Sequence, residues 1–188
     1  MENIEYNFFT KPPADIGIQE GDLFSREFSG DEQPQEIRDA HQDKEYSEKD
    51  QIGHHIAIQG GKLIGVVLAL KRNITYHGKD VLLGGIGGVA MLEEFRRQGI
   101  ASKLIASAMK QLKEEGCDIA YLCTDTNHLA PLYTPHGFVK MEKQYTLLGK
   151  SGKRYYEWDG MIAPVNSQEL FEEILHSPEP LDIGVGNW

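Results

Sequence analysis

The stretch that decides the fold is GGIGGVAMLEEFRRQGIASKL, residues Gly84–Leu104. Its first part belongs to an apolar run, Val81–Met91, that is typical of a buried strand, and a polar turn over Glu93–Gln98 follows it. From Gly99 to Leu112 apolar residues recur at helical spacing. The order of strand, short polar loop and helix predicts a helix N-terminus beside the end of a central strand.

The rest of the chain is predicted from the same patterns. The next strand, Asp118–Cys123, is reached through the helix and should therefore lie parallel to the central strand. Further strands are predicted over residues 138–148 and 154–162. Helices are expected within residues 15–32, over Glu36–Tyr46 and around Leu170–Leu175.

The loop between the central strand and the helix that follows it has the composition of an anion-binding site. Backbone N–H groups of a first helical turn have no intrahelical acceptor, and the helix dipole favours negative charge there. Gly99 lets the backbone approach an anion closely, and Arg96 and Arg97 stand beside it. The sequence therefore predicts a phosphate or pyrophosphate site, although an arginine pair on its own would more simply be a solvated turn.

A second interpretation of the glycines is a dinucleotide-binding fingerprint, because Gly85-x-Gly87-x-x-Ala90 has that spacing. Such a fingerprint needs a helix that begins at the glycines. Here the glycines lead into further strand-like residues, and the helix begins about ten residues later. The anion site is therefore expected at Arg96–Ala101 and not at the glycines.

Two motifs together resemble the GNAT acyltransferases. Arg96-x-x-Gly99-x-Ala101, after a strand that ends in Gly88–Met91, is similar to their acetyl-CoA pyrophosphate loop. Downstream, the segment Tyr133–Phe138 resembles their Tyr-x-x-x-Gly-Phe segment. The resemblance implies an α/β (α+β) fold with a mixed, mostly antiparallel central sheet flanked by helices on both faces. It covers residues 1–163 as one domain, and residues 164–188 are expected to add a helix and tail that pack on it.

The same resemblance implies that the chain binds acetyl-CoA as its co-substrate. Tyr133 would be the catalytic acid that protonates the leaving thiolate, and Asn127 would contact the cofactor, although it lies six residues before Tyr133 where the family has seven. The other expected cofactor-binding residues are Val89, Ala90, Met91, Arg96, Arg97, Gln98, Gly99, Ile100, Ala101 and Ser102.

The general base is left open by the sequence. Relatives carry a glutamate just before the Gly-Val pair of the central strand, and Gly87 occupies that position here. The candidates that remain are Asp125, His128, His136, an acid from residues 20–50 or a terminal carboxylate. The sequence has no His-Glu-x-x-His or paired-cysteine spacing, so no metal site is expected.

A narrower resemblance is to the aminoglycoside 2′-N-acetyltransferases. It rests on the segment Leu70–Gly78, on Gly88-Val89-Ala90 and on a final tryptophan, which in those enzymes lines the aminoglycoside pocket. It implies that Asp182 and Trp188 bind the substrate. The alternative is a frayed tail with an incidental tryptophan.

Composition limits the partners. The 188 residues carry a formal net charge of −10, which disfavours nucleic acid as a partner. No apolar run has membrane-spanning length and no signal-peptide pattern is present, so a cytoplasmic protein is expected. Cys117 and Cys123 are expected to be reduced, and a homodimer is plausible by resemblance. The acidic residues 20–50 are either a solvated surface or an acceptor site for a cationic amine.

These observations predict an N-acetyltransferase that moves an acetyl group from acetyl-CoA to a primary amine by direct attack in a ternary complex. The acceptor is expected to be a small cationic molecule, similar to an aminoglycoside or a polyamine. The alternatives are a protein or peptide N-acetyltransferase and a non-catalytic acyl-CoA-binding module.

Overall fold

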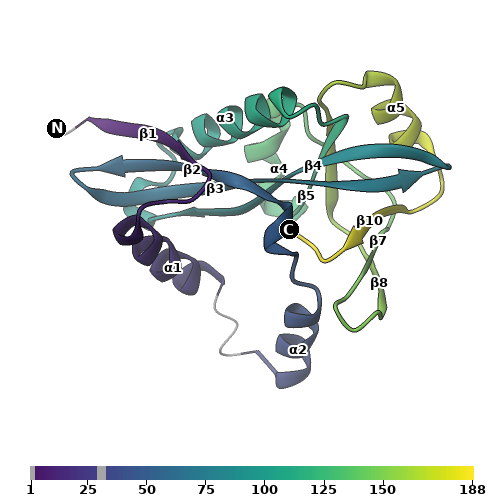
Figure 1. The fold of residues 1–188 in the computed structure, drawn as a ribbon, viewed down its shortest axis with the longest axis horizontal. Coiled ribbons are helices and arrows are strands. Elements are labelled where there is room, and N and C mark those ends of the chain that lie inside the picture. Colours follow the sequence, from purple (N-terminus) through teal and green to yellow (C-terminus); the bar gives the residue numbers. More distant parts are fainter. Residues whose placement is uncertain (1–2, 29–32) are drawn as a thin grey trace.

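The central element is a mixed sheet with helices on both faces (Figure 1), seen in a computed structural model that describes residues 3–28 and 33–188. Seven strands lie in the order β1-β2-β3-β4-β5-β9-β6, and a smaller sheet has the order β10-β7-β8. The strands are β1 (Ile4–Phe9), β2 (Gln51–Gln59), β3 (Lys62–Tyr76), β4 (Lys79–Met91), β5 (Ile119–Cys123), β6 (Val139–Lys140), β7 (Tyr145–Leu148), β8 (Arg154–Glu157), β9 (Gly160–Pro164) and β10 (Leu181–Val185). The α-helices are α1 (Ala14–Phe28), α2 (Gln35–Asp43), α3 (Ile100–Glu114), α4 (Thr126–Tyr133) and α5 (Gln168–His176). This arrangement confirms the predicted fold class.

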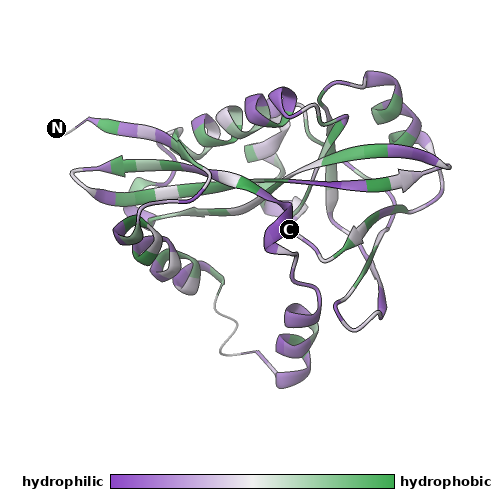
Figure 2. Cartoon of the chain, in the orientation of Figure 1, coloured by the Kyte–Doolittle hydropathy of each residue, from purple (hydrophilic) through white to green (hydrophobic). Residues whose placement is uncertain are grey.

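The middle strands are apolar over most of their length, where both of their faces are covered, and become polar toward one end (Figure 2). Successive side chains of β3 alternate between two clusters, as strand geometry requires. Leu68 and Leu70 belong to the cluster on the face of α1, whereas Val67 and Ala69 belong to the cluster on the face of α3. The strand therefore separates two cores.

The strand–helix–strand unit at the centre has the predicted parallel connection. β4 pairs in parallel with β5 over Leu83–Gly85 only, while its antiparallel pairing with β3 continues to Met91. A register shift between Val66 and Leu68 accompanies a positive φ of 53° at Gly88. Beyond Gly85, the edge of β4 that faces β5 has no strand partner among the described residues. This places an unpaired strand edge directly before the polar loop.

Two predicted strands were wrong in their extent. A continuous strand over residues 138–148 is replaced by β6 and β7, which lie in different sheets. Between them, the Lys143 ammonium donates to the carbonyl oxygens of Ile174 and Ser177 at the end of α5, so the chain leaves the central sheet. A continuous strand over residues 154–162 is broken at Asp159, whose φ of 66° is left-handed and incompatible with a strand.

The N-terminal helices lie on the face opposite α3 (Figure 1). α1 buries Ile16, Glu20 and Leu23 along one stripe, whereas α2 buries no side chain. The helix expected within residues 15–32 is α1, and the last four residues of that range lie outside the described residues. The second helix, predicted over Glu36–Tyr46, is shorter at its end than predicted.

The C-terminal segment also contains an unpredicted strand. α5 forms where its apolar spacing predicts, and β10 then pairs in parallel with β7. From there the chain runs back under the middle of the central sheet (Figure 1).

Within the described residues, no helix is both long and apolar enough to cross a membrane.

One buried histidine predicts acid sensitivity of the fold. His55 on β2 is 2% exposed, and its Nδ1 lies 2.9 Å from the Ser107 hydroxyl of α3. Burial, with the neighbouring His54, lowers its pKa from 6.5 to about 4. The unfolded chain therefore binds a proton below pH 6.5 that the folded protein does not bind until about pH 4, so stability falls as the pH falls through this range.

We expect the free energy of unfolding to fall by up to about 2 kcal/mol between pH 7 and pH 4 through this residue, after allowance for solvent screening. Denaturant titrations at both pH values would measure it. In His55→Phe the acid-dependent loss should be smaller by that amount. An unchanged loss in the variant would contradict the assignment.

Candidate active site

The end of β4 and the start of α3 enclose a cavity of about 520 Å³ that contains most of the predicted cofactor residues. Glu27, Phe28, Phe95, Leu129 and Leu132 complete its lining. The predicted residues on its wall are Val89, Met91, Arg96, Arg97, Gly99, Ile100, Ala101, Ser102 and Tyr133. Three predicted residues lie outside the lining. Ala90 is buried on β4, Gln98 donates to the Glu94 carbonyl oxygen, and Asn127 is exposed in the first turn of α4.

The loop presents its backbone N–H groups to this cavity. Arg97 and Gly99 have left-handed φ values of 60° and 77°, and α3 begins at Ile100 without a side-chain cap. The N–H groups of the first turn therefore have no acceptor within the helix. Together with the helix dipole they form a cradle that fits a diphosphate.

The two arginines of the loop have different surroundings. Arg96 donates to both oxygens of Glu27 on α1, at 2.6 and 2.8 Å, and through Nε to the Met91 carbonyl oxygen at 3.2 Å. It thereby ties the loop to α1 and to the end of β4. Arg97 is exposed, and no carboxylate of the described residues pairs with it. Arg97 is therefore the guanidinium of this loop that is available to a phosphate.

Tyr133 lines this cavity and lies near residues of a second one, which shares Phe28 with the first. Its side chain is 5% exposed and packs edge-on against Phe138, with ring centroids 6.1 Å apart. Burial raises its pKa to about 12, so the phenol stays protonated at neutral pH. Cys123 and Thr124, which line the second cavity, are close enough to Tyr133 to influence that pKa.

The second cavity, of about 710 Å³, lies between α1, the segment after α2, and the turn between β8 and β9. Its walls are largely aromatic, and three carboxylates stand around it. The aromatic residues are Phe24, Phe28, Tyr46, Tyr145, Trp158 and Trp188, and the acids are Glu45, Glu157 and Asp159. Phe28 and Trp158 are more than half exposed, as expected at a mouth that admits a large molecule.

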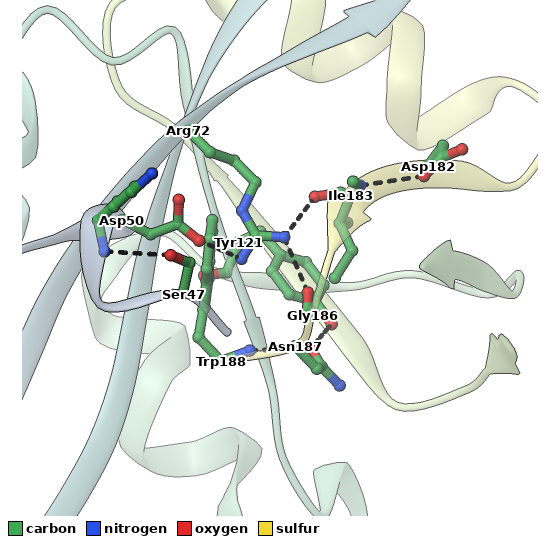
Figure 3. A network of polar contacts seen from close by, with 11 residues as sticks. Ser47, Asp50, Arg72, Tyr121, Asp182, Ile183, Gly186, Asn187 and Trp188 are labelled. Carbon is green, nitrogen blue, oxygen red and sulfur yellow. Dashed lines mark hydrogen bonds and ion pairs between the residues drawn. The ribbon is translucent and has the colours of Figure 1, made fainter. Parts of the chain in front are cut away.

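The two predicted substrate residues are separated by the structure. Trp188 is 7% exposed and lines the second cavity. Asp182 lies outside the lining: its carboxylate pairs with Arg154 at 2.7 Å and accepts from the Gly184 N–H (Figure 3). Phe24 and Trp158 also line this cavity and were not predicted as site residues. In the sequence they stand out only as large apolar side chains among polar residues.

The candidates for the base are dispersed. Asp125 and His128 pair with each other at the exposed start of α4, 2.7 Å apart. His136 Nε2 lies 2.9 Å from the Ser102 hydroxyl, next to the cofactor cavity, and burial lowers its pKa. Of the acids in residues 20–50, Glu45 lines the second cavity and Glu27 the first.

Neither cysteine has the properties of a nucleophile. Burial raises the pKa of Cys117 to about 11 and also raises the pKa of Cys123. Both thiols are unbridged. In addition, the described part of the chain contains no group of three His, Cys, Asp or Glu side chains placed to hold a metal ion.

The sequence matches a family profile described as the acetyltransferase (GNAT) domain, over residues 21–140. The chain belongs to the GNAT acetyltransferase family. Membership confirms the predicted enzyme class, an acyltransferase that uses acetyl-CoA, and the diphosphate cradle of the first cavity fits this cofactor.

Two curated relatives are both named N-alpha-acetyltransferase 30. The protein from Schizosaccharomyces pombe is 30% identical over 104 residues, which are 53% of this chain and 67% of the relative. The protein from Saccharomyces cerevisiae is 33% identical over 86 residues, 45% of this chain and 44% of the relative. The chain therefore matches about two thirds of one relative's length and less than half of the other's.

Solved structures show the same fold. One is the NatC complex bound to Gag peptide and CoA, with a TM-score of 0.57, 22% identity, and coverage of 87% of this chain and 99% of that one. Another is the GNAT family N-acetyltransferase YhbS from Escherichia coli in complex with CoA, with a TM-score of 0.59, 18% identity, and coverage of 97% and 91%. No particular closeness to the aminoglycoside enzymes is shown by these matches.

Proposed function

We propose that this GNAT acetyltransferase transfers the acetyl group of acetyl-CoA to the α-amine of a polypeptide N-terminus. The observation that carries the proposal is that both curated relatives are named N-alpha-acetyltransferase. A structural neighbour, the NatC complex bound to Gag peptide and CoA, supports it. This replaces the small cationic amine as the preferred acceptor and adopts what the sequence offered as an alternative.

Acetyl-CoA supplies an activated acetyl thioester, and the residues of the first cavity bind and orient it. The open edge of β4 at Val89–Met91 offers backbone groups to an extended arm, as a neighbouring strand would. The first turn of α3 and Arg97 hold the phosphates. Tyr133 keeps a proton on Oη at neutral pH, which it can give to the leaving sulfur. Holding both reactants in adjoining cavities makes the transfer effectively unimolecular.

The second cavity is the proposed acceptor site. Its aromatic walls suit the apolar side chains of a peptide, and its exposed mouth at Phe28 and Trp158 leaves room for the chain to continue. Glu157 and Asp159 are carboxylates that would attract an incoming ammonium group, and it would compete there with Lys44, which pairs with Glu157 at 2.8 Å, and with Lys140, 3.7 Å from Asp159. The same acids are the observation that favours the second candidate, a small cationic amine.

A panel of acceptors separates the two candidates. Thiol release from acetyl-CoA would be measured with synthetic peptides that differ in their first residue, with the same peptides blocked at the N-terminus, and with aminoglycosides and polyamines. We expect turnover only with free N-termini, and acetyl groups on the α-amine by mass spectrometry. Turnover with aminoglycosides or polyamines and none with peptides would overturn the proposal.

A cavity variant adds a structural test. Trp158→Ala should raise the KM for the accepted peptide by roughly tenfold, because a half-exposed aromatic wall is lost, and leave the KM for acetyl-CoA unchanged. Tyr156→Ala is a matched control, because Tyr156 is equally exposed on the same hairpin but does not line the cavity. Equal effects of the two variants would contradict the placement of the acceptor.

A further inference from the structure

The glycines of β4 form a seat for the Trp188 indole. A Cβ atom on Gly85 would overlap the indole Nε1, and one on Gly87 would lie 3.3 Å from the Trp188 Cβ. The indole N–H donates to the Tyr121 carbonyl oxygen at 3.3 Å. Glycine at positions 85 and 87 therefore leaves the space that Trp188 fills.

Arg72 of β3 lies over the Trp188 indole (Figure 3). Its guanidinium carbon lies 3.8 Å from the ring centroid. The same group donates to the carbonyl oxygens of Ile183 and Gly186, at 2.9 and 2.8 Å, and to the Asp50 carboxylate at 2.8 Å. Arg72 is 8% exposed, so its contacts are shielded from water. Cation–π contacts and hydrogen bonds to charged groups are strongest in such a shielded environment.

Asn187 is fixed by a separate set of contacts. Its side chain accepts from the Tyr121 hydroxyl and donates to the Tyr145 hydroxyl, both at 3.0 Å. Its backbone N–H donates to the Lys44 carbonyl oxygen at 2.6 Å. Residues 186–188 are therefore held between β3, β5, β7 and the end of α2. Asn187, Trp188, Lys44 and Tyr145 all line the 710 Å³ cavity.

We propose that Arg72 is a positioning residue that sets acceptor selectivity, because it holds residues 186–188 as a wall of the acceptor cavity with Trp188 seated on Gly85. This inference rests on the proposed function of that cavity. Arg72 itself does not line the cavity, so it acts through the segment that it binds. Loss of Arg72 frees residues 186–188 to move and leaves the cofactor loop intact.

The test compares Arg72→Met, Arg72→Lys and Gly85→Ala with the control Lys71→Met. Lys71 is the neighbouring residue, and it pairs with Glu115 at the end of α3, away from both cavities. Kinetics use acetyl-CoA and the best acceptor of the panel. In Arg72→Met and Gly85→Ala we expect the acceptor KM to rise by about tenfold or more and the ranking of acceptors to flatten, with an unchanged KM for acetyl-CoA. Arg72→Lys keeps the charge and should recover part of the effect.

Tryptophan fluorescence provides an independent readout. The chain has two tryptophans, so a Trp158→Phe background leaves Trp188 as the sole reporter. Emission should shift to longer wavelength in the Arg72→Met and Gly85→Ala variants and not with Lys71→Met. Gly85→Ala displaces the indole from β4, whereas Arg72 holds it from β3, so it tests the same wall if Arg72→Met does not fold.

The outcomes separate this inference from the proposed function. A wild-type enzyme that acetylates small amines in place of peptides would overturn the peptide assignment, and the kinetic comparison would then be made with that amine. An unchanged acceptor KM and ranking in folded Arg72→Met and Gly85→Ala would overturn the role of Arg72. Unshifted Trp188 emission in both variants would contradict the claim that Arg72 and Gly85 hold the indole in place.

Discussion

Replacing Tyr133 with phenylalanine should lower kcat by about 10²- to 10⁴-fold, the range typical of a lost general acid. The variant removes the one hydroxyl and keeps the ring, its packing against Phe138 and its burial. The KM for acetyl-CoA should therefore change little, because Tyr133 contributes wall area to the cofactor cavity with the atoms that remain. Steady-state kinetics with saturating acceptor would measure both constants.

The dependence of kcat on pH tests the same role of Tyr133. The pKa of Tyr133 is raised to about 12, so the acid is protonated at every pH below that value. Ionisation of Tyr133 should therefore cause no loss of kcat at any pH up to 10. Plots of kcat against pH for the wild type and for Tyr133→Phe should be parallel up to that pH. Tyr76→Phe serves as the control because Tyr76 is also a buried tyrosine, 4% exposed, and it lines neither cavity. A Tyr133→Phe enzyme with near-normal kcat would refute the acid role.

Replacing Ala101 with glutamate should abolish useful acetyl-CoA binding without destabilising the fold. Ala101 is in the first turn of α3, on the wall of the cofactor cavity. A carboxylate there would repel a phosphate by roughly 4 kcal/mol at 4 Å, equivalent to about a 10³-fold weaker affinity. The same carboxylate complements the helix dipole, so the melting temperature should stay the same or rise.

The control for Ala101→Glu is the same substitution further along the helix. Ala106 of α3 is exposed and does not line the cavity, so Ala106→Glu adds the same charge to the same element. Calorimetric titration with CoA should show binding to Ala106→Glu and none to Ala101→Glu at concentrations that saturate the wild type. Comparable CoA affinity in the two variants would contradict the placement of the phosphates.

The loop and helical turn that line the first cavity could be predicted because they are contiguous in the chain. Arg96–Ser102 form one loop and one helical turn, and the spacing of Arg96, Gly99 and Ala101 reflects local backbone geometry. The sequence did not reveal that Arg96 and Arg97 have different partners. Arg96 is engaged by Glu27, which is far away in sequence, and Arg97 is left for the ligand.

The acceptor side was harder to predict because it has no contiguous motif. Its walls come from α1, β3, β5, the β8–β9 turn and residues 187–188, which only the packing of the sheets and helices brings together. The break at Asp159 illustrates the difficulty. A left-handed aspartate interrupts a run of strand-forming residues. The turn-forming pair Asp159-Gly160 is a local signal for this break, but strand-forming residues on both sides compete with it.

Taken alone, the amino-acid sequence determined the family and the strand–loop–helix, and it pointed to the loop and the tyrosine that line the first cavity. These features depend on hydrogen bonds and dihedral angles within a few consecutive residues, so a short motif encodes them. Only the tertiary structure decided the shape of the acceptor cavity and the place of Trp188 between Arg72 and Gly85. Those contacts join residues about a hundred positions apart, and they form because burying the indole and the guanidinium together removes both from water.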